Sequence, residues 1–216
     1  MREVEIKLRI PDRKKLDRAL RKLKARSPQA GPPVRVHELN VIFDTPDGGL
    51  AKHGQLLRIR TETSRRKGSG KSGKAARRVV LTFKAPVGTA PSSGRHKERE
   101  ETELAIADPE ALTKIFQGLG LAGWFRYEKH RTTYVLPASE RWAAGLLLEV
   151  DETPIGTFLE LEGPPAAIDQ AAQALGFSYR DYVVKNYLEL YAEDCRRRGE
   201  QPRDMLFANA AGQRKN

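Results

Sequence analysis

The sequence predicts an α+β protein in which antiparallel strands outnumber helices. Eight segments alternate apolar and polar residues with the period of two that is typical of strands. Turns or short helices connect most of them, and such short connections favour antiparallel neighbours. Seven of the eight segments carry charged residues at the polar positions, with both signs present. An open sheet with one solvated face explains this pattern, and so does a closed barrel with a charged, water-filled interior.

The first expected strand is the clearest, because residues 1–10 alternate throughout. On a strand this spacing places Glu3, Glu5 and Lys7 on one face and apolar residues on the other. The next strand spans residues 34–43 and ends at the turn sequence Asp-Thr-Pro-Asp-Gly-Gly. The six later strands are expected at residues 55–62, 79–84, 95–106, 125–136, 146–151 and 157–162.

Four helices are expected between and after the strands. Asp12 and Asp108 are suitable N-cap residues for the first two helices, and Pro165 suits the first turn of the third. The fourth is expected because aromatic and apolar residues from Tyr179 to Tyr191 recur at helical spacing. The expected ranges are 12–24, 109–119, 165–175 and 178–196.

The bulk properties limit the class of protein. A chain of 216 residues is long enough for one domain with a real core. Lys and Arg number 39 against 28 Asp and Glu, and the net charge of +11 favours an anionic partner. The single cysteine, Cys195, excludes an internal disulfide and a thiolate metal cluster. No apolar run has membrane-spanning length and the N-terminus lacks a signal-peptide region, so we expect a cytoplasmic protein with no membrane partner.

Much of the positive charge lies in two stretches without apolar periodicity. We expect residues 64–77 to form a flexible basic loop and residues 194–216 to form a basic, disordered tail. Gly70-Lys71-Ser72 resembles part of a phosphate-binding loop, but Arg65 stands where that pattern requires glycine. Weak non-specific binding of nucleic acid is the alternative to a plain surface loop. The sequence has no motif of a dedicated nucleic-acid module.

Charged residues that share a strand face fall into two groups. The acidic group is Glu3, Glu5, Glu101, Glu103, Glu149, Asp151, Glu160 and Glu162. The basic group is Lys7, Arg58, Arg60, Lys84, Lys97, Arg99, Lys129 and Arg131. If the two groups converge, the carboxylates can hold divalent cations and the basic side chains can hold a polyphosphate. Such a site suits phosphoanhydride chemistry, in which positioning and charge neutralisation supply most of the catalysis.

The order of the motifs resembles the CYTH-domain family of triphosphate tunnel metalloenzymes, which includes triphosphatases and class IV adenylate cyclases. The resemblance covers residues 1–193, and Asn186 departs from it because the family has serine there. The motifs that carry the resemblance are Glu3-x-Glu5-x-Lys7, Phe43-Asp44-Thr45-Pro46, Leu57-Arg58-Ile59-Arg60, Thr82-x-Lys84, Arg99-x-Glu101, Lys129-x-Arg131, Leu148 to Asp151, Glu160-x-Glu162 and Lys185-Asn186-Tyr187.

The resemblance implies one domain, residues 1–193, built as an eight-stranded antiparallel β-barrel with flanking helices and a C-terminal helix at one mouth. It implies that Mg²⁺ or Mn²⁺ ions are bound by Glu3, Glu5, Asp151, Glu160 and Glu162. It implies that a triphosphate is held by Lys7, Arg58, Arg60, Lys84, Lys129, Arg131 and Lys185. Glu3, Glu5, Lys7 and Lys84 would act most directly in catalysis. Lys185 would reach one mouth from the last helix.

Three functions remain open at this point. The first is metal-dependent hydrolysis of inorganic triphosphate, thiamine triphosphate or a nucleoside triphosphate by water, without a protein nucleophile. The second is conversion of ATP to cyclic AMP and pyrophosphate, and the third is polyphosphate binding without turnover. The presence of both Arg58 and Arg60 favours hydrolysis, because the cyclases tend to keep one arginine in that strand, and no residue set here specifies adenine. The complete set of metal ligands argues against binding alone. The sequence leaves a homodimer open.

Overall fold

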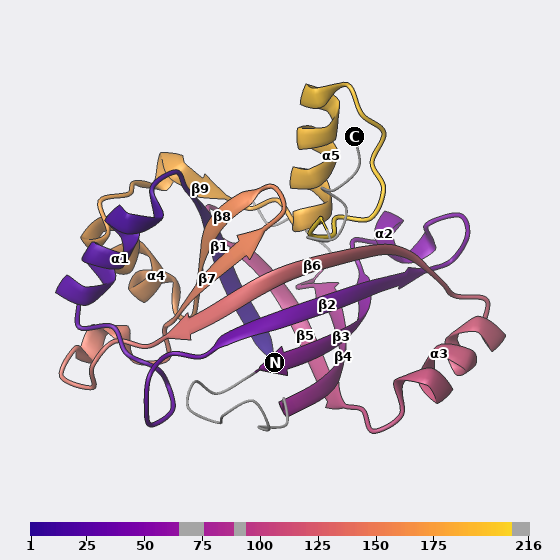
Figure 1. Cartoon of the computed structure of the whole chain (residues 1–216), viewed down its shortest axis with the longest axis horizontal. Coiled ribbons are helices and arrows are strands. Elements are labelled where there is room, and N and C mark those ends of the chain that lie inside the picture. The colour runs from indigo at the N-terminus through magenta and orange to yellow at the C-terminus, as the bar shows by residue number, and fades with distance from the viewer. Residues whose placement is uncertain (65–75, 89–93, 209–216) are drawn as a thin grey trace, which may run out of the picture.

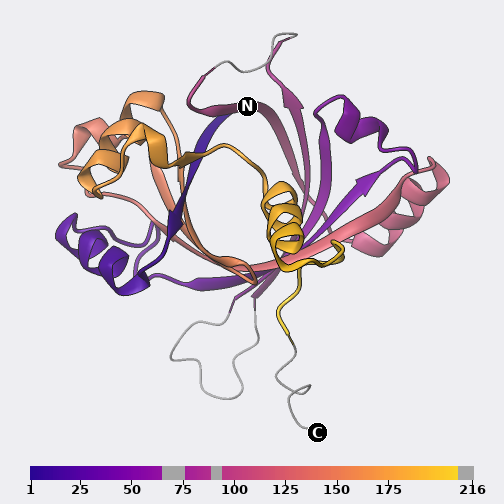
Figure 2. The ribbon, with the colours of Figure 1, turned by 90° about the horizontal axis from the view of Figure 1, so that it is seen from above.

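The computed structural model describes residues 1–64, 76–88 and 94–208. Within them, eight antiparallel strands close into a barrel in the order β1-β8-β7-β6-β2-β3-β4-β5, and β5 pairs back to β1 (Figure 1; Figure 2). The closed barrel confirms the arrangement that the resemblance implies. The strands are β1 Arg2–Ile10, β2 Arg35–Asp44, β3 Leu56–Ser64, β4 Ala76–Pro86, β5 Lys97–Ala105, β6 Ala122–Tyr134, β7 Leu147–Thr153 and β8 Gly156–Glu162.

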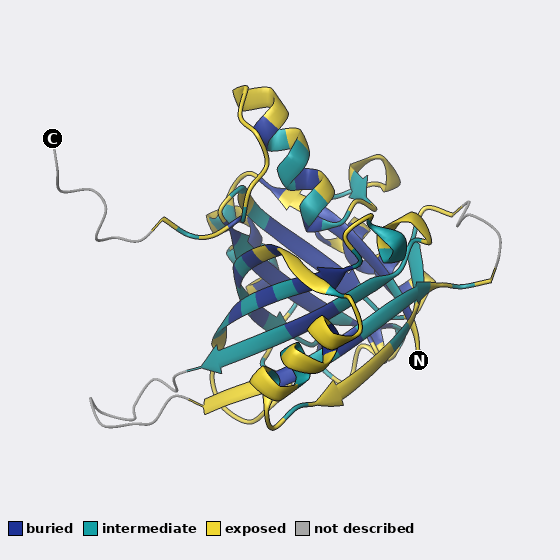
Figure 3. Ribbon diagram, turned by 90° about the vertical axis from the view of Figure 1, so that its right-hand side faces the viewer, coloured by how far each residue is buried: buried dark blue, intermediate teal, exposed yellow. Residues whose placement is uncertain are grey.

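The main apolar core lies outside the barrel, between its wall and two helices. Ile6 and Leu8 of β1 are fully buried in one cluster with Leu16 of α1 (Arg13–Lys22) and Ile168 of α4 (Pro165–Ala174). Burial of each such side chain stabilises the fold by about 2 kcal/mol. Because side chains alternate along a strand, this packing turns the charged face of β1 toward the barrel interior. Figure 3 shows that buried residues are concentrated in the barrel strands.

The helix α5 (Tyr187–Arg198) stands at one mouth of the barrel (Figure 2). A capping box fixes its first turn, because Asn186 Oδ1 accepts the Glu189 N–H at 2.9 Å and Glu189 Oε2 accepts the Asn186 N–H at 2.7 Å. Asparagine in place of the family's serine therefore still caps this helix. Tyr187 and Leu190 pack in a second apolar cluster with Phe125 of β6. Two further α-helices in the described part of the chain are α2 (Gly49–Lys52) and α3 (Pro109–Gly118).

The expected start of the last helix at residue 178 is wrong. Residues Tyr179–Asp181 form a single 3-10 turn, and Tyr182–Val183 form a short strand, β9, which pairs with β1. β5 covers this edge of β1 only as far as Glu5, so β9 satisfies the backbone groups that follow. The Tyr182 hydroxyl also donates to Asp169 at 2.8 Å, which holds the segment in an extended conformation.

The expected disordered tail is also wrong for the portion that the structure describes. α5 continues to Arg198, and Met205 beyond it is only 1% exposed. The Met205 backbone donates to Arg126 and accepts from Glu128, both at 2.9 Å. β7 pairs with β6 only from residue 130 onward, so this C-terminal segment occupies the edge that β7 leaves open. Residues 209–216 lie outside the described part of the chain.

Most of the expected basic loop also lies outside the described residues. Ser64 is the last residue of β3, Ala76 is the first of β4, and residues 65–75 between them are not described. None of the helices that the structure describes is both long and apolar enough to cross a membrane.

Candidate active site

A cavity of about 490 Å³ lies inside the barrel, which is a suitable size for a small-molecule ligand. Its wall is formed mainly by ionisable side chains, and α2 and the first turn of α5 border it. The charged residues in the wall are Glu3, Glu5, Lys7, Asp44, Arg58, Arg60, Lys84, Lys97, Arg99, Glu101, Glu103, Lys129, Arg131, Glu149, Glu160, Glu162 and Glu189. The structure thus brings together almost every predicted site residue, with Asp151 and Lys185 absent from the wall.

Strand register explains why these residues meet. β1 and β8 pair so that Glu5 lies opposite Glu162 and Lys7 lies opposite Glu160. Directly opposite residues of antiparallel strands project on the same face with Cβ atoms about 5 Å apart. One carboxylate and one ammonium group of the Glu-x-Glu-x-Lys motif, those of Glu5 and Lys7, therefore face the two carboxylates of the Glu-x-Glu motif.

Lysines neutralise most of these carboxylates. Lys7 Nζ lies 3.0 Å from Glu5 Oε1 and 3.2 Å from Glu160 Oε1, while Lys97 Nζ lies 2.9 Å from Glu5 Oε1. Lys84 Nζ is 2.6 Å from Glu3 Oε1. Burial alone would raise the pKa of Glu5, but the attraction of Lys7 and Lys97 outweighs it and holds that pKa well below its usual value. Glu5 is therefore an anion at neutral pH.

Glu162 differs from its neighbours because no ion pair reaches it from residues 1–64, 76–88 or 94–208. Burial raises its pKa most, the negative charges of Glu149 and Glu3 act in the same direction, and the resulting pKa is about 8. The Glu162 carboxyl group therefore largely keeps its proton at neutral pH, because a further negative charge among these carboxylates is unfavourable. A divalent cation bound among these oxygens would favour the ionised form of Glu162.

The chemistry of the donors fits Mg²⁺ or Mn²⁺, because Glu3, Glu5, Glu160 and Glu162 offer only carboxylate oxygens. Among the described residues, no three His, Cys, Asp or Glu side chains are already gathered around one ion position. The lysine contacts explain this, since ammonium groups hold the same oxygens that a metal would take.

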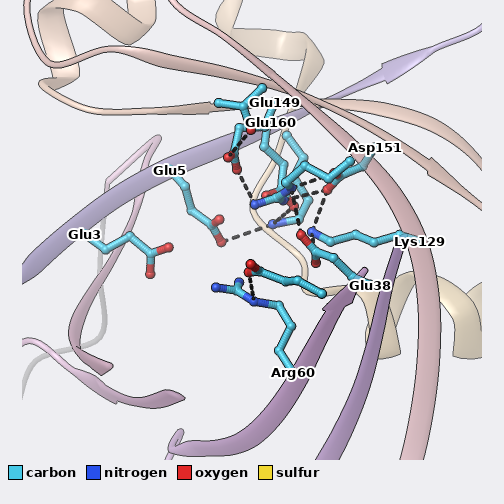
Figure 4. Close-up of polar contacts among 12 residues, drawn as sticks. Glu3, Glu5, Glu38, Arg60, Lys129, Glu149, Asp151 and Glu160 are labelled. Carbon is cyan, nitrogen blue, oxygen red and sulfur yellow. Dashed lines mark hydrogen bonds and ion pairs between the residues drawn. The ribbon is translucent and has the colours of Figure 1, made fainter. Parts of the chain in front are cut away.

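Asp151 anchors a second ionic cluster behind the cavity wall. It is fully buried, and Arg131 donates to its two oxygens from Nε and Nη2, both at 2.7 Å. Lys129 Nζ and the Tyr187 hydroxyl both donate to Asp151 Oδ2 at 2.8 Å. Asp151, predicted as a metal ligand, therefore holds two of the predicted phosphate-binding cations and does not line the cavity. Figure 4 shows Lys129 and Asp151 side by side.

Two arginines from β3 enter the cavity from another side. Arg58 donates to the Tyr127 hydroxyl at 3.0 Å and to Thr82 Oγ1 at 3.2 Å. Arg60 donates to Glu103 at 3.1 Å. Burial would lower the pKa of Arg58, but its contact with Tyr127 raises it, and the guanidinium stays charged.

Lys185 takes no part in the wall. It precedes α5 instead of lying on it, its side chain is half exposed, and its ammonium pairs with Glu193 on the outside of the helix. Asn186, Tyr187, Leu188 and Glu189 border the cavity from this segment.

Glu38 of β2 does not line the cavity, but it is a buried partner of two wall cations that the sequence patterns did not indicate. It is 3% exposed, and its carboxylate lies 3.6 Å from Lys129 Nζ and 3.8 Å from Arg131 Nε. Burial would raise the pKa of Glu38, but Lys129 and Arg131 lower it to about 2. The usable signal was its place in phase with Asn40 and Ile42, opposite the apolar face of the same strand.

Glu38→Gln is expected to lower the free energy of unfolding at pH 7 by about 2–4 kcal/mol, because an amide cannot neutralise Lys129 and Arg131. The pKa of Glu38 is lower in the folded protein than its usual value of 4.5. The advantage of the wild type is therefore fully present above pH 4.5 and is lost as the pH falls toward 2. Urea unfolding at pH 7 and at pH 3 measures both effects.

Glu152→Gln is the matched control, because Glu152 pairs with Arg13 and Arg35 at the partly exposed surface. Its expected cost is below about 1 kcal/mol. An equal loss for Glu38→Gln at both pH values would assign the effect to packing and not to charge.

Comparison with known proteins places these features in a family. The family profile of the CYTH domain matches residues 1–177. A protein of Methanocaldococcus jannaschii named "putative adenylate cyclase" is 27% identical over 201 residues, which are 88% of this chain and 98% of the relative.

Solved structures share the fold. A conserved hypothetical protein from Pyrococcus furiosus is 26% identical with a TM-score of 0.62, over 87% of this chain and 99% of that one. A protein from Hippeastrum, described as a "putative adenylyl cyclase" with a dominant triphosphatase activity, is 21% identical with a TM-score of 0.52, over 93% of this chain and 97% of that one.

Proposed function

The chain belongs to the CYTH domain family, and on that premise we propose that it hydrolyses the terminal phosphoanhydride of a triphosphate with the help of Mg²⁺ or Mn²⁺. The distribution of charge inside the barrel carries the proposal. Glutamates of β1 and arginines of β3 and β6 line one cavity. In Figure 4, Glu3, Glu5 and Arg60 point into the same space from different sides. A polyanion and the cation that it needs can both be held there.

The cations of the cavity wall suit a chain of phosphates. Arg58 and Arg60 present planar guanidinium groups that can contact phosphate oxygens, while Arg131 and Lys129, which are held by carboxylates, add positive charge to the wall. Tyr127 and Thr82 fix the guanidinium of Arg58, while Asp151 fixes that of Arg131. These groups are held before a ligand arrives, so little ordering is needed when a triphosphate binds.

Glu3, Glu5, Glu160 and Glu162 are the residues that would hold a divalent cation. When bound there, such an ion supplies Lewis-acid polarisation of phosphoryl oxygens and a lower pKa for water. The lysines that now neutralise the glutamates, Lys7 and Lys84, would become available to contact the phosphates.

The alternative is conversion of ATP to cyclic AMP and pyrophosphate. The name of the Methanocaldococcus jannaschii relative favours it. The triphosphatase activity ascribed to the Hippeastrum protein and the presence of both Arg58 and Arg60 favour hydrolysis. Binding of polyphosphate without turnover is the third outcome that an experiment must distinguish.

One panel of reactions tests the proposal. The full chain is incubated with inorganic triphosphate, thiamine triphosphate or ATP, each with Mg²⁺, with Mn²⁺ or with a chelator, and phosphate, pyrophosphate and cyclic AMP are quantified. We expect phosphate as the main product from at least one substrate and its loss in chelator. Cyclic AMP as the main product from ATP would establish the cyclase instead. No product from any substrate would favour polyphosphate binding without turnover.

A further inference from the structure

A β-bulge at the start of β6 directs a tryptophan toward the cavity. β2 and β6 pair with Ile42 opposite Phe125 and Phe43 opposite Gly123, so Trp124 has no partner on β2. Bulges are frequent at barrel rims and beside active sites, where they redirect a side chain. Trp124 lines the cavity and is 48% exposed. An indole left half in water at the rim of a charged cavity is not explained by core packing.

Three apolar side chains line the cavity at the end where Trp124 lies, together with the polar residues Asp44 and Gln55. Ile42 and Leu56 lie there because the end of β2 pairs with the starts of β3 and β6, and Leu188 of α5 packs in the same cluster. All three line the cavity. A triphosphate ion alone has no group that would contact these apolar side chains favourably. A triphosphate ester has one, its organic moiety.

The ends of the barrel give the ligand a direction. β6 and β8 both run antiparallel to β7, so the start of β6 and the end of β8 lie at opposite ends of the barrel. Trp124 is near the start of β6, while Glu162 is the last residue of β8. A phosphate chain with its terminal phosphate near the β1 and β8 glutamates would therefore extend its other end toward Trp124.

We propose that the substrate is an organic triphosphate whose ring system stacks on Trp124. This inference rests on the proposed function and narrows its substrate class from triphosphates in general to esters of triphosphate with a flat ring. Indole is a large aromatic surface, and stacking on it tolerates different rings because every such ring has a π face. Trp124 selects for the presence of a ring and not for its identity.

A second cavity gives a competing position for the ring. It measures about 610 Å³, and Met1, Glu3 and Glu162 belong to the walls of both cavities. Arg141 and Ala143, which flank Trp142 in the chain, line this second cavity. Trp142 itself donates to Glu140 at 2.7 Å and packs on the main core cluster. The chain contains two tryptophans, so each can report on one cavity.

Kinetics give the first test. Trp124→Ala is expected to raise KM for ATP and thiamine triphosphate by about 5- to 150-fold, because one stacking interaction is lost. KM for inorganic triphosphate should stay unchanged. Trp124→Phe keeps a stacking surface and is expected to recover most of the affinity. Trp142→Phe is the matched control and should leave KM unchanged for the esters and for inorganic triphosphate. An equal rise for esters and for inorganic triphosphate in Trp124→Ala would overturn the proposal.

Fluorescence gives a second test that does not need turnover. With Mg²⁺, adenosine 5′-(β,γ-imido)triphosphate should change the emission of Trp142→Phe protein, in which Trp124 is the remaining indole, and inorganic triphosphate should not. A change confined to Trp124→Phe protein would place the ring in the second cavity and overturn the assignment. Emission changes without any product would contradict the proposed hydrolysis but support the binding subsite at Trp124. Turnover of esters with the same KM in wild type and Trp124→Ala would contradict the subsite but support hydrolysis.

Discussion

Glu5→Gln is expected to lower kcat/KM for the triphosphate by two to three orders of magnitude, about 3–4 kcal/mol in transition-state stabilisation. Glu5 lines the cavity, stays ionised, and faces Glu162 across the β1–β8 pair. The amide keeps the shape of the side chain but cannot supply the negative charge that a divalent cation requires. Because Glu160 still neutralises Lys7 in the variant, the barrel is expected to fold.

The measurement compares initial rates of phosphate release and Mg²⁺ or Mn²⁺ affinity by titration calorimetry. Glu100→Gln is the matched control, since Glu100 is exposed on β5, which pairs with the same strand. Weaker metal binding together with lower rates would support the metal role. Normal rates with unchanged metal affinity would exclude Glu5 from the site.

The fold could be predicted because its signal is local. Alternation on β1 is legible from nine residues, and the apolar face that packs on α1 and α4 gives the opposite face by elimination. Closure is not local. The contact between Glu3 and Arg99 that closes the ring joins strands 96 residues apart in the chain, and only the ordered set of family motifs pointed to it.

The site was predicted to the extent that charge and phase define it. Glu3, Glu5 and Glu160, which line the cavity, could be proposed as candidates because each belongs to a charged pair on one strand face. Glu38 stands alone on β2 with an amide neighbour, so no pair marked it. The position of a residue in the strand alternation also cannot distinguish a side chain that lines the cavity from one that is bonded to neighbouring side chains. Asp151 shares the inward face with Glu149, and only Arg131 and Lys129 from the adjacent strand decide that it is occupied.

The errors at the C-terminus have the same origin. Tyr179 and Val183 do recur at helical spacing with the later tyrosines, but pairing of Val183 with Lys7 overrides that local preference. Met205 is one apolar residue in a polar stretch, which composition alone assigns to a tail. Its burial depends on the part of β6 that does not pair with β7, which only the folded structure defines.

Arg131→Met is expected to lower the free energy of unfolding by about 3–5 kcal/mol and to abolish turnover. Arg131 contacts Asp151, Glu149 and Glu160 together, and these carboxylates are all at least nine-tenths buried. Removing their shared cation leaves buried negative charge without compensation, which costs far more than loss of an exposed pair. Urea unfolding at pH 7 measures the stability.

Arg126→Met is the control for that variant, because Arg126 lies on the same strand and pairs with Asp204 at the surface, where its side chain is 58% exposed. Its expected cost is below about 1 kcal/mol. Adding Glu149→Gln to Arg131→Met should recover part of the lost stability, since one of the three carboxylates then carries no charge. Activity should not return, because the guanidinium that would hold phosphate is still absent. If the double variant is no more stable than Arg131→Met, the loss comes from packing around the arginine and not from unbalanced charge.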